Sequence, residues 1–181
     1  MKRVEELLRE GWSVLRVDAV AGEAGKTREV GEAGEAGEVG EAAEEAAAEH
    51  AREAGREAAL LLTHALGWSK EQLWVRSREV VDDEQEKYFR ELLAARRHGK
   101  PVAYLVGEKE FYSLKFYVGE GVLVPRPDTE ILVEAVLGYF RALPPSPVPS
   151  AGIRLLDWGT GSGCLAVALA QTGAAVGLMD S

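Results

Sequence analysis

A glycine-rich junction near residue 160 constrains the fold more than any other feature of the sequence. An apolar segment at 153–157 leads into Asp157-Trp-Gly-Thr-Gly-Ser-Gly163, and a helical pattern follows at 163–171. A second apolar segment at 174–179 ends in Asp180. This order predicts a β-α-β unit with parallel strands and a right-handed crossover. We therefore expect an α/β fold in this part of the chain.

The same junction predicts a ligand site. A glycine loop before a helix presents free backbone N–H groups and the positive end of the helix dipole. Glycines at 159, 161 and 163 would let a ligand approach the backbone closely. A carboxylate at the end of the second strand, Asp180, is placed to accept hydrogen bonds from a ribose diol. These features favour a nucleoside-containing cofactor.

The spacing of the glycines leaves two cofactors open. The run Gly161-Ser-Gly-Cys-Leu-Ala166 satisfies a weakened dinucleotide pattern, which would indicate an oxidoreductase. Asp157 would then face a pyrophosphate, which a carboxylate repels. An acid in this position suits a cofactor with a cationic amino group and no phosphate, such as S-adenosylmethionine. No Gly-Lys-Ser/Thr follows the glycines, so a P-loop is excluded.

An acidic low-complexity tract occupies residues 22–45, where glutamate and glycine recur every third residue. Residues 22–57 hold 11 Glu and 4 Lys or Arg, so most of the net charge of −9 lies there. Frequent glycines and like charges disfavour a helix, and the tract has little to bury. We expect about 22–45 to be a disordered insert in a helical domain that spans residues 1–98, although alanine replaces glycine from about Glu41 and makes helix less costly there.

Helical patterns and capping residues mark that first domain. Ser69 is expected to cap one short helix, and Asp82 or Asp83 the next. Small helical bundles of this kind usually bind other molecules. A non-catalytic binding module is therefore an alternative reading of the chain.

A different pattern begins at residue 99. Lys109–Tyr112 and Lys115–Val118 predict a hairpin around Ser113–Leu114. Asp128 or Thr129 is expected to cap the helix that follows, within a connecting region at 99–143. A proline-rich linker at 144–152 then precedes the β-α-β unit at 153–181.

Composition excludes several other classes. A single cysteine and three unclustered histidines argue against a disulfide framework or a zinc site. No apolar run reaches the roughly 18–20 residues that span a bilayer, so we expect no membrane association. The sequence lacks the excess of Lys and Arg that proteins use to bind nucleic acid, so we expect no direct binding of nucleic acid. The cysteine usage and the lack of a signal-peptide pattern favour the cytoplasm.

Four ordered motifs resemble one enzyme family. Gly99-Lys-Pro-Val-Ala-Tyr-Leu-Val-Gly107, Glu110-Phe111, Val122-Leu-Val-Pro-Arg-Pro-Asp-Thr-Glu130 and Leu156-Asp-Trp-Gly-Thr-Gly-Ser-Gly163 look like the peptide chain release factor N(5)-glutamine methyltransferases of the HemK type. The resemblance is close over 99–181 and looser over 52–98. It does not include the acidic tract.

The resemblance implies a helical substrate-recognition domain, a hairpin connection and a Rossmann-like methyltransferase domain. It implies methylation, with S-adenosylmethionine, of the glutamine in the Gly-Gly-Gln motif of release factors, by a monomer that works near the ribosome. The implied cofactor residues are Asp157, Gly159, Thr160, Gly161, Ser162, Gly163 and Asp180. The segment 125–130 would pack beside the active site without a catalytic role.

The sequence departs from that family in one respect. The family holds the substrate amide with an Asn-Pro-Pro-Tyr motif, but this chain has no asparagine, and its one Pro-Pro pair is Pro144-Pro145. No catalytic residue is therefore assigned. Because two parallel strands cannot complete a domain, we interpret the chain as the front part of a longer enzyme. We expect it to be inactive by itself and to bind cofactor weakly.

Overall fold

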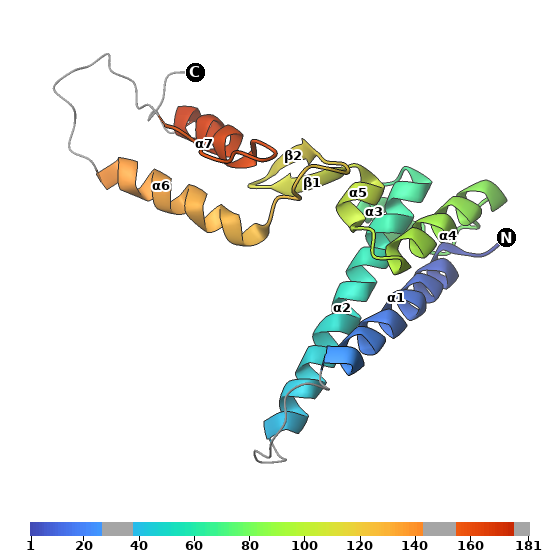
Figure 1. Ribbon diagram of the computed structural model, residues 1–181. Helices are drawn as coiled ribbons and strands as arrows, with labels where there is room; N and C mark the ends of the chain where they lie inside the picture. Colours follow the sequence, from blue (N-terminus) through green and yellow to red (C-terminus); the bar gives the residue numbers. More distant parts are fainter. Residues whose placement is uncertain (27–37, 143–154, 176–181) are drawn as a thin grey trace. The chain divides into compact units, whose positions relative to one another are not determined.

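The computed structural model describes the backbone of residues 1–26, 38–142 and 155–175, and the chain divides into two compact units (Figure 1). The first unit comprises Met1–Val106 and the second Gly107–Ser181. The division falls later than the expected boundary after residue 98. The short helix α5 (Val102–Val106) explains this, because Val102, Leu105 and Val106 pack against the core of the first unit.

The first unit is helical, as its sequence predicts. The long helices α1 (Val4–Lys26) and α2 (Glu38–Leu66) lie side by side, and α4 (Asp83–Arg97) packs against both of them (Figure 1). The short helix α3 (Lys70–Val75) contacts α2. The buried core of the first unit consists of apolar side chains from helices α1 to α4 and from the segment between α3 and α4. They are Val4, Leu7, Leu15, Ala54, Ala58, Leu61, Leu62, Leu66, Leu73, Val81, Phe89, Leu92 and Leu93.

The caps expected in this unit are confirmed. The side chain of Ser69 accepts a hydrogen bond from the backbone N–H of Gln72, whose own side chain accepts one from the N–H of Ser69. This reciprocal pair satisfies two N–H groups that the helix itself leaves free. Of the two candidates for α4, Asp82 is the cap and accepts from the N–H groups of Glu84 and Gln85 at 2.9 Å.

Helix extends into both ends of the acidic tract. Residues 22–26 belong to α1, and residues 38–45 belong to α2, although 22–45 was expected to lack structure. Alanine replaces glycine toward the C-terminal end of the tract, which lowers the backbone cost of helix there. The rest of the tract, 27–37, lies outside the described residues.

The second unit contains the predicted hairpin, but each of its strands lies one residue earlier in the sequence than expected. Strands β1 (Glu108–Phe111) and β2 (Leu114–Tyr117) pair antiparallel, with Phe111 opposite Leu114. Tyr112 and Ser113 form the turn and have φ values of 51° and 60°, which non-glycine residues rarely adopt. A type I′ hairpin turn requires positive φ values at both central positions. The turn therefore lies one residue earlier than the Ser113–Leu114 turn expected from the sequence.

Two helices pack against this hairpin. They are α6 (Glu130–Ala142), which follows a 3₁₀ turn η1 (Pro127–Thr129), and α7 (Cys164–Ala175) (Figure 1). The expected cap is wrong: Asp128 and Thr129 lie inside η1, and Arg126 precedes it without a capping side-chain bond. The core of the second unit contains Phe111, Val133, Leu137, Cys164, Ala168 and Leu169.

The β-α-β unit is described only in part. Residues 155–157 form no strand, and residues 174–175 lie in α7 where the second strand was expected to begin. A strand needs a hydrogen-bonded neighbour, and the hairpin is the only sheet among the described residues. The rest of both expected strands and the linker at 144–152 lie outside the described residues. The Rossmann-like fold therefore stays a prediction.

Candidate functional site

Three glycines of the loop before α7 adopt a backbone conformation that other residues rarely adopt. Gly159, Gly161 and Gly163 have φ values of 79°, 54° and 75°, in the left-handed region. A Cβ added at any of them would meet no heavy atom closer than 3.9 Å. Backbone conformation, rather than crowding within the protein, therefore requires glycine here. The loop is closed by a hydrogen bond of 2.8 Å from the N–H of Gly163 to the carbonyl of Thr160.

Asp157 carries an unsatisfied charge at the start of this loop. Its Oδ2 atom is buried and has no hydrogen-bond partner in the part of the chain that the structure describes. A buried carboxylate oxygen without a partner costs on the order of 1–3 kcal/mol, and a cationic or hydrogen-bonding ligand would remove that cost. The sequence argument expected a cofactor ammonium group at this residue, and the unpartnered oxygen fits such a group.

A cleft of about 150 Å³ joins this loop to the segment before α6. It brings together one carboxylate, one guanidinium, several hydroxyls and an apolar wall. Its lining residues are Leu123, Val124, Pro125, Arg126, Thr129, Asp157, Gly159, Thr160, Gly161, Ser162, Cys164 and Leu165. The apolar wall suits a flat ring system, and the polar groups suit a charged end.

Five of the predicted cofactor residues line this cleft: Asp157, Gly159, Thr160, Gly161 and Ser162. Gly163 adjoins them at the start of α7. Asp180 lies outside the described residues, so its proposed contact with a ribose stays a prediction. The sequence argument left the segment 123–129 without a ligand role. The resemblance had placed 125–130 beside the active site, and its residues Pro125, Arg126 and Thr129 do line the cleft.

Cys164 follows the loop and lies in the core of the second unit, 8% exposed. Its burial supports a packing role. No group of three His, Cys, Asp or Glu side chains that could hold a metal ion occurs among the described residues.

The first unit has a separate, charged cleft of about 240 Å³ between the middle of α1, α2 and the end of α4. Arg96 crosses it to form two hydrogen bonds with Glu57, at 2.8 and 2.9 Å. This carboxylate raises the pKa of the Arg96 guanidinium above its ordinary value. The bidentate pair joins α4 to α2.

Comparison with known proteins identifies relatives of the chain. The PrmC N-terminal domain matches residues 39–107. The predicted resemblance is confirmed. The chain is 44% identical over 117 residues to a release factor glutamine methyltransferase of Rhodopirellula baltica, covering 64% of this chain and 38% of the relative. It is 40% identical over 128 residues to that of Shewanella oneidensis, covering 71% and 42%.

A third relative, the release factor glutamine methyltransferase of Escherichia coli, is 42% identical over 116 residues. That match covers 64% of this chain and 39% of the relative. The chain therefore spans about two fifths of the length of these methyltransferases. None of the described helices has the length and apolarity needed to cross a bilayer.

Proposed function

We propose that this chain functions in the methylation of the glutamine side-chain amide in the Gly-Gly-Gln motif of peptide chain release factors. S-adenosylmethionine is the proposed methyl donor. Its relatives are named release factor glutamine methyltransferases, which supports the methyltransferase class and the release factor substrate. The observation that carries the cofactor assignment is the buried, unpartnered Oδ2 of Asp157 beside a glycine-lined cleft.

The residues of the cleft suggest how the cofactor would be held. S-adenosylmethionine, when bound, supplies a methyl group activated by a sulfonium centre. The Asp157 carboxylate would accept hydrogen bonds from the α-ammonium group, which gives its buried oxygen a partner. Gly159, Gly161 and Gly163 keep side chains away from the loop backbone. Asp180 would hold the ribose hydroxyls, and the expected Rossmann-like domain would position it.

The methyl acceptor is a weak nucleophile. An amide nitrogen shares its lone pair with the carbonyl, so an enzyme must orient it and accept hydrogen bonds from its NH₂ group. The resemblance assigns that role to an Asn-Pro-Pro-Tyr motif, and this sequence has no asparagine. We expect the chain by itself to bind the cofactor weakly and not to transfer the methyl group.

The first unit is proposed to recognise the release factor. It has its own buried core, and its charged cleft lies on the helical domain that matches the PrmC N-terminal domain. A monomer in the cytoplasm, close to the ribosome, suits a partner that acts in translation termination. The alternative function, a non-catalytic module that only binds the release factor, needs this unit alone.

The cofactor assignment is tested by titrating the whole chain with S-adenosylmethionine, S-adenosylhomocysteine and NAD. We expect the two adenosyl compounds to bind and NAD not to bind. Asp157→Asn should weaken binding of S-adenosylmethionine about 10-fold, because a neutral amide replaces the partner of the ammonium group. Asp128→Asn is the matched control, since Asp128 is exposed on η1 and does not line the cleft. Preferential binding of NAD would favour the oxidoreductase alternative.

The substrate assignment is tested with a purified release factor and its Gln→Ala variant in the Gly-Gly-Gln motif. We expect the chain to bind the release factor, and mass spectrometry to find no added methyl group with this chain alone. Binding that survives Asp157→Asn would place recognition in the first unit. A chain that bound neither the release factor nor an adenosyl compound would contradict the proposed function.

A further inference from the structure

Arg126 is a charged residue of the cleft to which the sequence assigned no role. It lines the same cleft as Asp157 and lies immediately before η1. Its backbone carbonyl accepts a hydrogen bond of 3.0 Å from the N–H of Thr129. Its side chain is exposed and makes no hydrogen bond or ion pair in the described part of the chain. The guanidinium is therefore available to a ligand.

The neighbouring prolines restrict how Arg126 can be presented. Pro125 is buried, and Pro127 occupies the first position of η1. A residue before proline is confined to extended backbone, and Arg126 has φ −101° and ψ 139°. The buried Pro125 fixes one side of the residue and the 3₁₀ turn fixes the other. The Cα of Arg126 is thus held at the edge of the cleft while the side chain keeps its freedom.

The two charges of the cleft have opposite signs and are not paired with each other. Among the described residues that line it, Asp157 and Arg126 are the only charged ones. No ion pair joins them, and the Oδ2 of Asp157 has no partner among the described residues. A cleft with a separate anion and cation is complementary to a zwitterion. The amino acid end of S-adenosylmethionine is a zwitterion, with an α-ammonium and an α-carboxylate on one carbon.

We propose that Arg126 binds the α-carboxylate of the methionine part of the cofactor while Asp157 binds the α-ammonium. This inference rests on the proposed function and identifies a further cofactor-binding residue for it. A guanidinium offers two parallel N–H groups that match the two oxygens of a carboxylate. The cleft would then select adenosyl compounds by their charged amino acid end as well as by their purine.

Three ligands distinguish the contribution of Arg126 from that of Asp157. S-adenosylhomocysteine has both the carboxylate and the ammonium, its decarboxylated analogue has only the ammonium, and 5′-methylthioadenosine has neither. Each is titrated into the whole chain by NMR chemical shifts, which measure weak dissociation constants. The variants are Arg126→Gln, Asp157→Asn and Arg141→Gln. Arg141 is the matched control because it is an exposed arginine on α6 that does not line the cleft.

We expect Arg126→Gln to weaken S-adenosylhomocysteine about 10-fold, as the loss of a charge-assisted pair implies. The decarboxylated analogue should bind this variant as well as the original chain, or slightly better, since an unneeded positive charge is gone. Asp157→Asn should weaken both amine-containing ligands. The affinity for 5′-methylthioadenosine should change less than 2-fold in either variant, and Arg141→Gln should change none of the three affinities.

Two results would overturn the inference while the proposed function stands. Equal losses for all three ligands in Arg126→Gln would make Arg126 a residue that shapes the cleft. No loss for any ligand, combined with weaker binding of the release factor, would assign its guanidinium to the protein substrate. If the original chain bound none of the three ligands, the cofactor assignment itself would fail, and this inference with it.

Discussion

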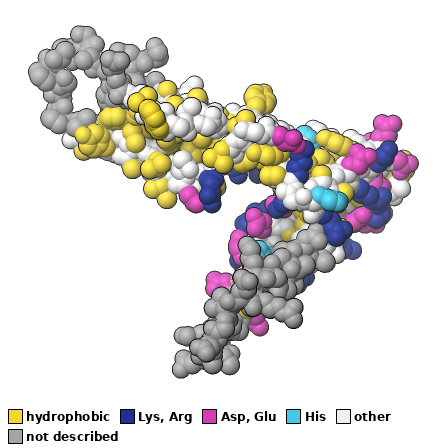
Figure 2. All heavy atoms as spheres, viewed as in Figure 1, with side chains coloured by type: hydrophobic (Ala, Val, Ile, Leu, Met, Phe, Trp, Pro, Cys, Tyr) yellow, Lys and Arg dark blue, Asp and Glu magenta, His cyan; other side chains and the backbone are white. Residues whose placement is uncertain are grey.

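The two units of this chain use apolar residues differently. In the first unit the helices enclose their apolar side chains, and the visible surface carries charges of both signs (Figure 2). In the second unit a mostly hydrophobic surface is visible (Figure 2), and Ile131, Leu156 and Trp158 are 71%, 81% and 92% exposed. Large exposed apolar patches are uncommon on monomeric soluble proteins. Apolar content alone therefore does not make a core; helices or strands must cover it from more than one side.

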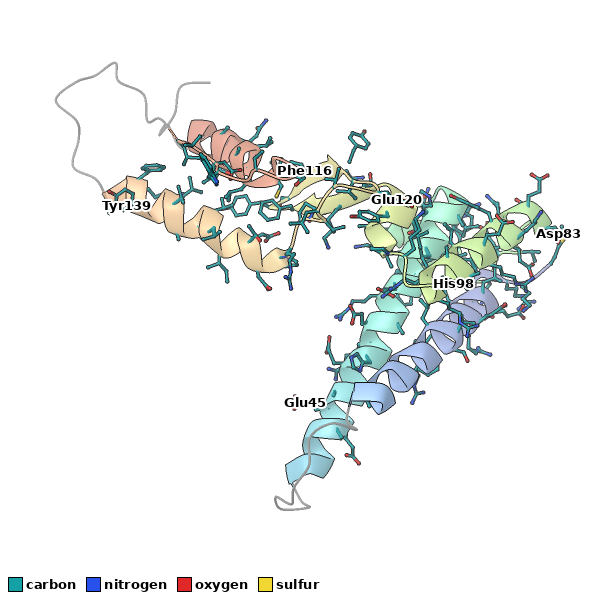
Figure 3. All side chains as sticks on the ribbon, in the orientation of Figure 1. Glu45, Asp83, His98, Phe116, Glu120 and Tyr139 are labelled. Atoms are coloured by element: carbon teal, nitrogen blue, oxygen red, sulfur yellow. The ribbon has the colours of Figure 1, made fainter. Side chains whose placement is uncertain are left out.

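The aromatic side chains of the second unit illustrate the contrast. Phe111 is buried and contacts Phe116 edge to face, with ring centroids 6.2 Å apart. Tyr139 projects from α6 and is 65% exposed, although it stands next to Phe140 (Figure 3). Only the face of α6 that meets the hairpin and α7 is covered. The second unit should consequently have the smaller margin of stability.

The largest expected effect compares the two cores directly. Phe89→Ala in the first unit and Phe111→Ala in the second each remove a side chain that is at most 1% exposed. A buried phenylalanine truncated to alanine costs about 3–5 kcal/mol. We expect Phe89→Ala to lower the urea midpoint of a first unit that still unfolds cooperatively. Phe111→Ala should abolish the cooperative transition of the second unit, because its core is smaller.

Urea unfolding followed by circular dichroism and by NMR of each unit measures both outcomes. Tyr88→Ala is the control on α4, since Tyr88 is 42% exposed and should cost much less than Phe89. If both phenylalanine variants shifted one common transition equally, the two units would fold as one, and the comparison would be wrong.

A smaller effect tests the close contact of helices within the first unit. A Cβ at Gly11 would lie 2.9 Å from Cζ of Phe89 and 3.1 Å from Cβ of Ala58. Gly11→Ala must therefore displace α1 or Phe89, at a cost of about 1–3 kcal/mol. A Cβ at Gly55 would meet only Cδ1 of Trp12, at an ordinary 3.5 Å. Gly55→Ala should raise stability by about 0.5–1 kcal/mol, since alanine favours helix.

This pair of substitutions is its own control, because both exchange glycine for alanine in a helix of the same unit. The free energy of unfolding in urea should fall for one and rise for the other. Equal changes of the same sign would mean that helix propensity, rather than packing of α1 against α4, sets the stability at both positions.

Local chemistry was the part of the structure that the sequence predicted well. The hydroxyl of Ser69 and the carboxylate of Asp82 cap their helices because a cap depends only on the next few residues. The role of Asp157 toward a cationic group of a cofactor stays a prediction, and its buried Oδ2 has no partner among the described residues.

Features that depend on distant residues were missed. The hairpin turn moved to Tyr112 and Ser113, where Glu130 of α6 accepts a hydrogen bond of 3.0 Å from the N–H of Tyr112. The ordinary propensities of tyrosine and serine do not favour that turn. The resemblance placed the segment 125–130 beside the active site, but no local pattern indicated that Arg126 itself lines the cleft. The strand expected at 153–157 required neighbouring strands, and none pairs with the described part of it.

The smallest expected effect concerns a surface network of the first unit. Glu10 accepts from Nε of Arg90 at 3.0 Å and from Nζ of Lys2 at 2.6 Å, which links α1 to α4. The Arg90 guanidinium, with help from Lys2, lowers the pKa of the Glu10 carboxyl below its ordinary value of 4.5. A carboxyl group whose pKa is lower in the folded than in the unfolded protein stabilises the fold at pH values above its pKa in the unfolded protein. That stabilisation is lost as the pH falls through its pKa in the folded protein.

We therefore expect Glu10→Gln to lower the free energy of unfolding by about 0.5–1 kcal/mol at pH 7, the range for partly exposed ion pairs. As the pH falls below the lowered pKa of the folded-state Glu10 carboxyl, the variant and the original chain should converge, because the carboxyl is then protonated in both states. Glu91→Gln is the control, since Glu91 pairs with Lys87 at 4.0 Å and its side chain is 62% exposed. A Glu10→Gln loss that stayed constant with pH would assign the effect to packing, and the charge would then play no part in joining α1 to α4.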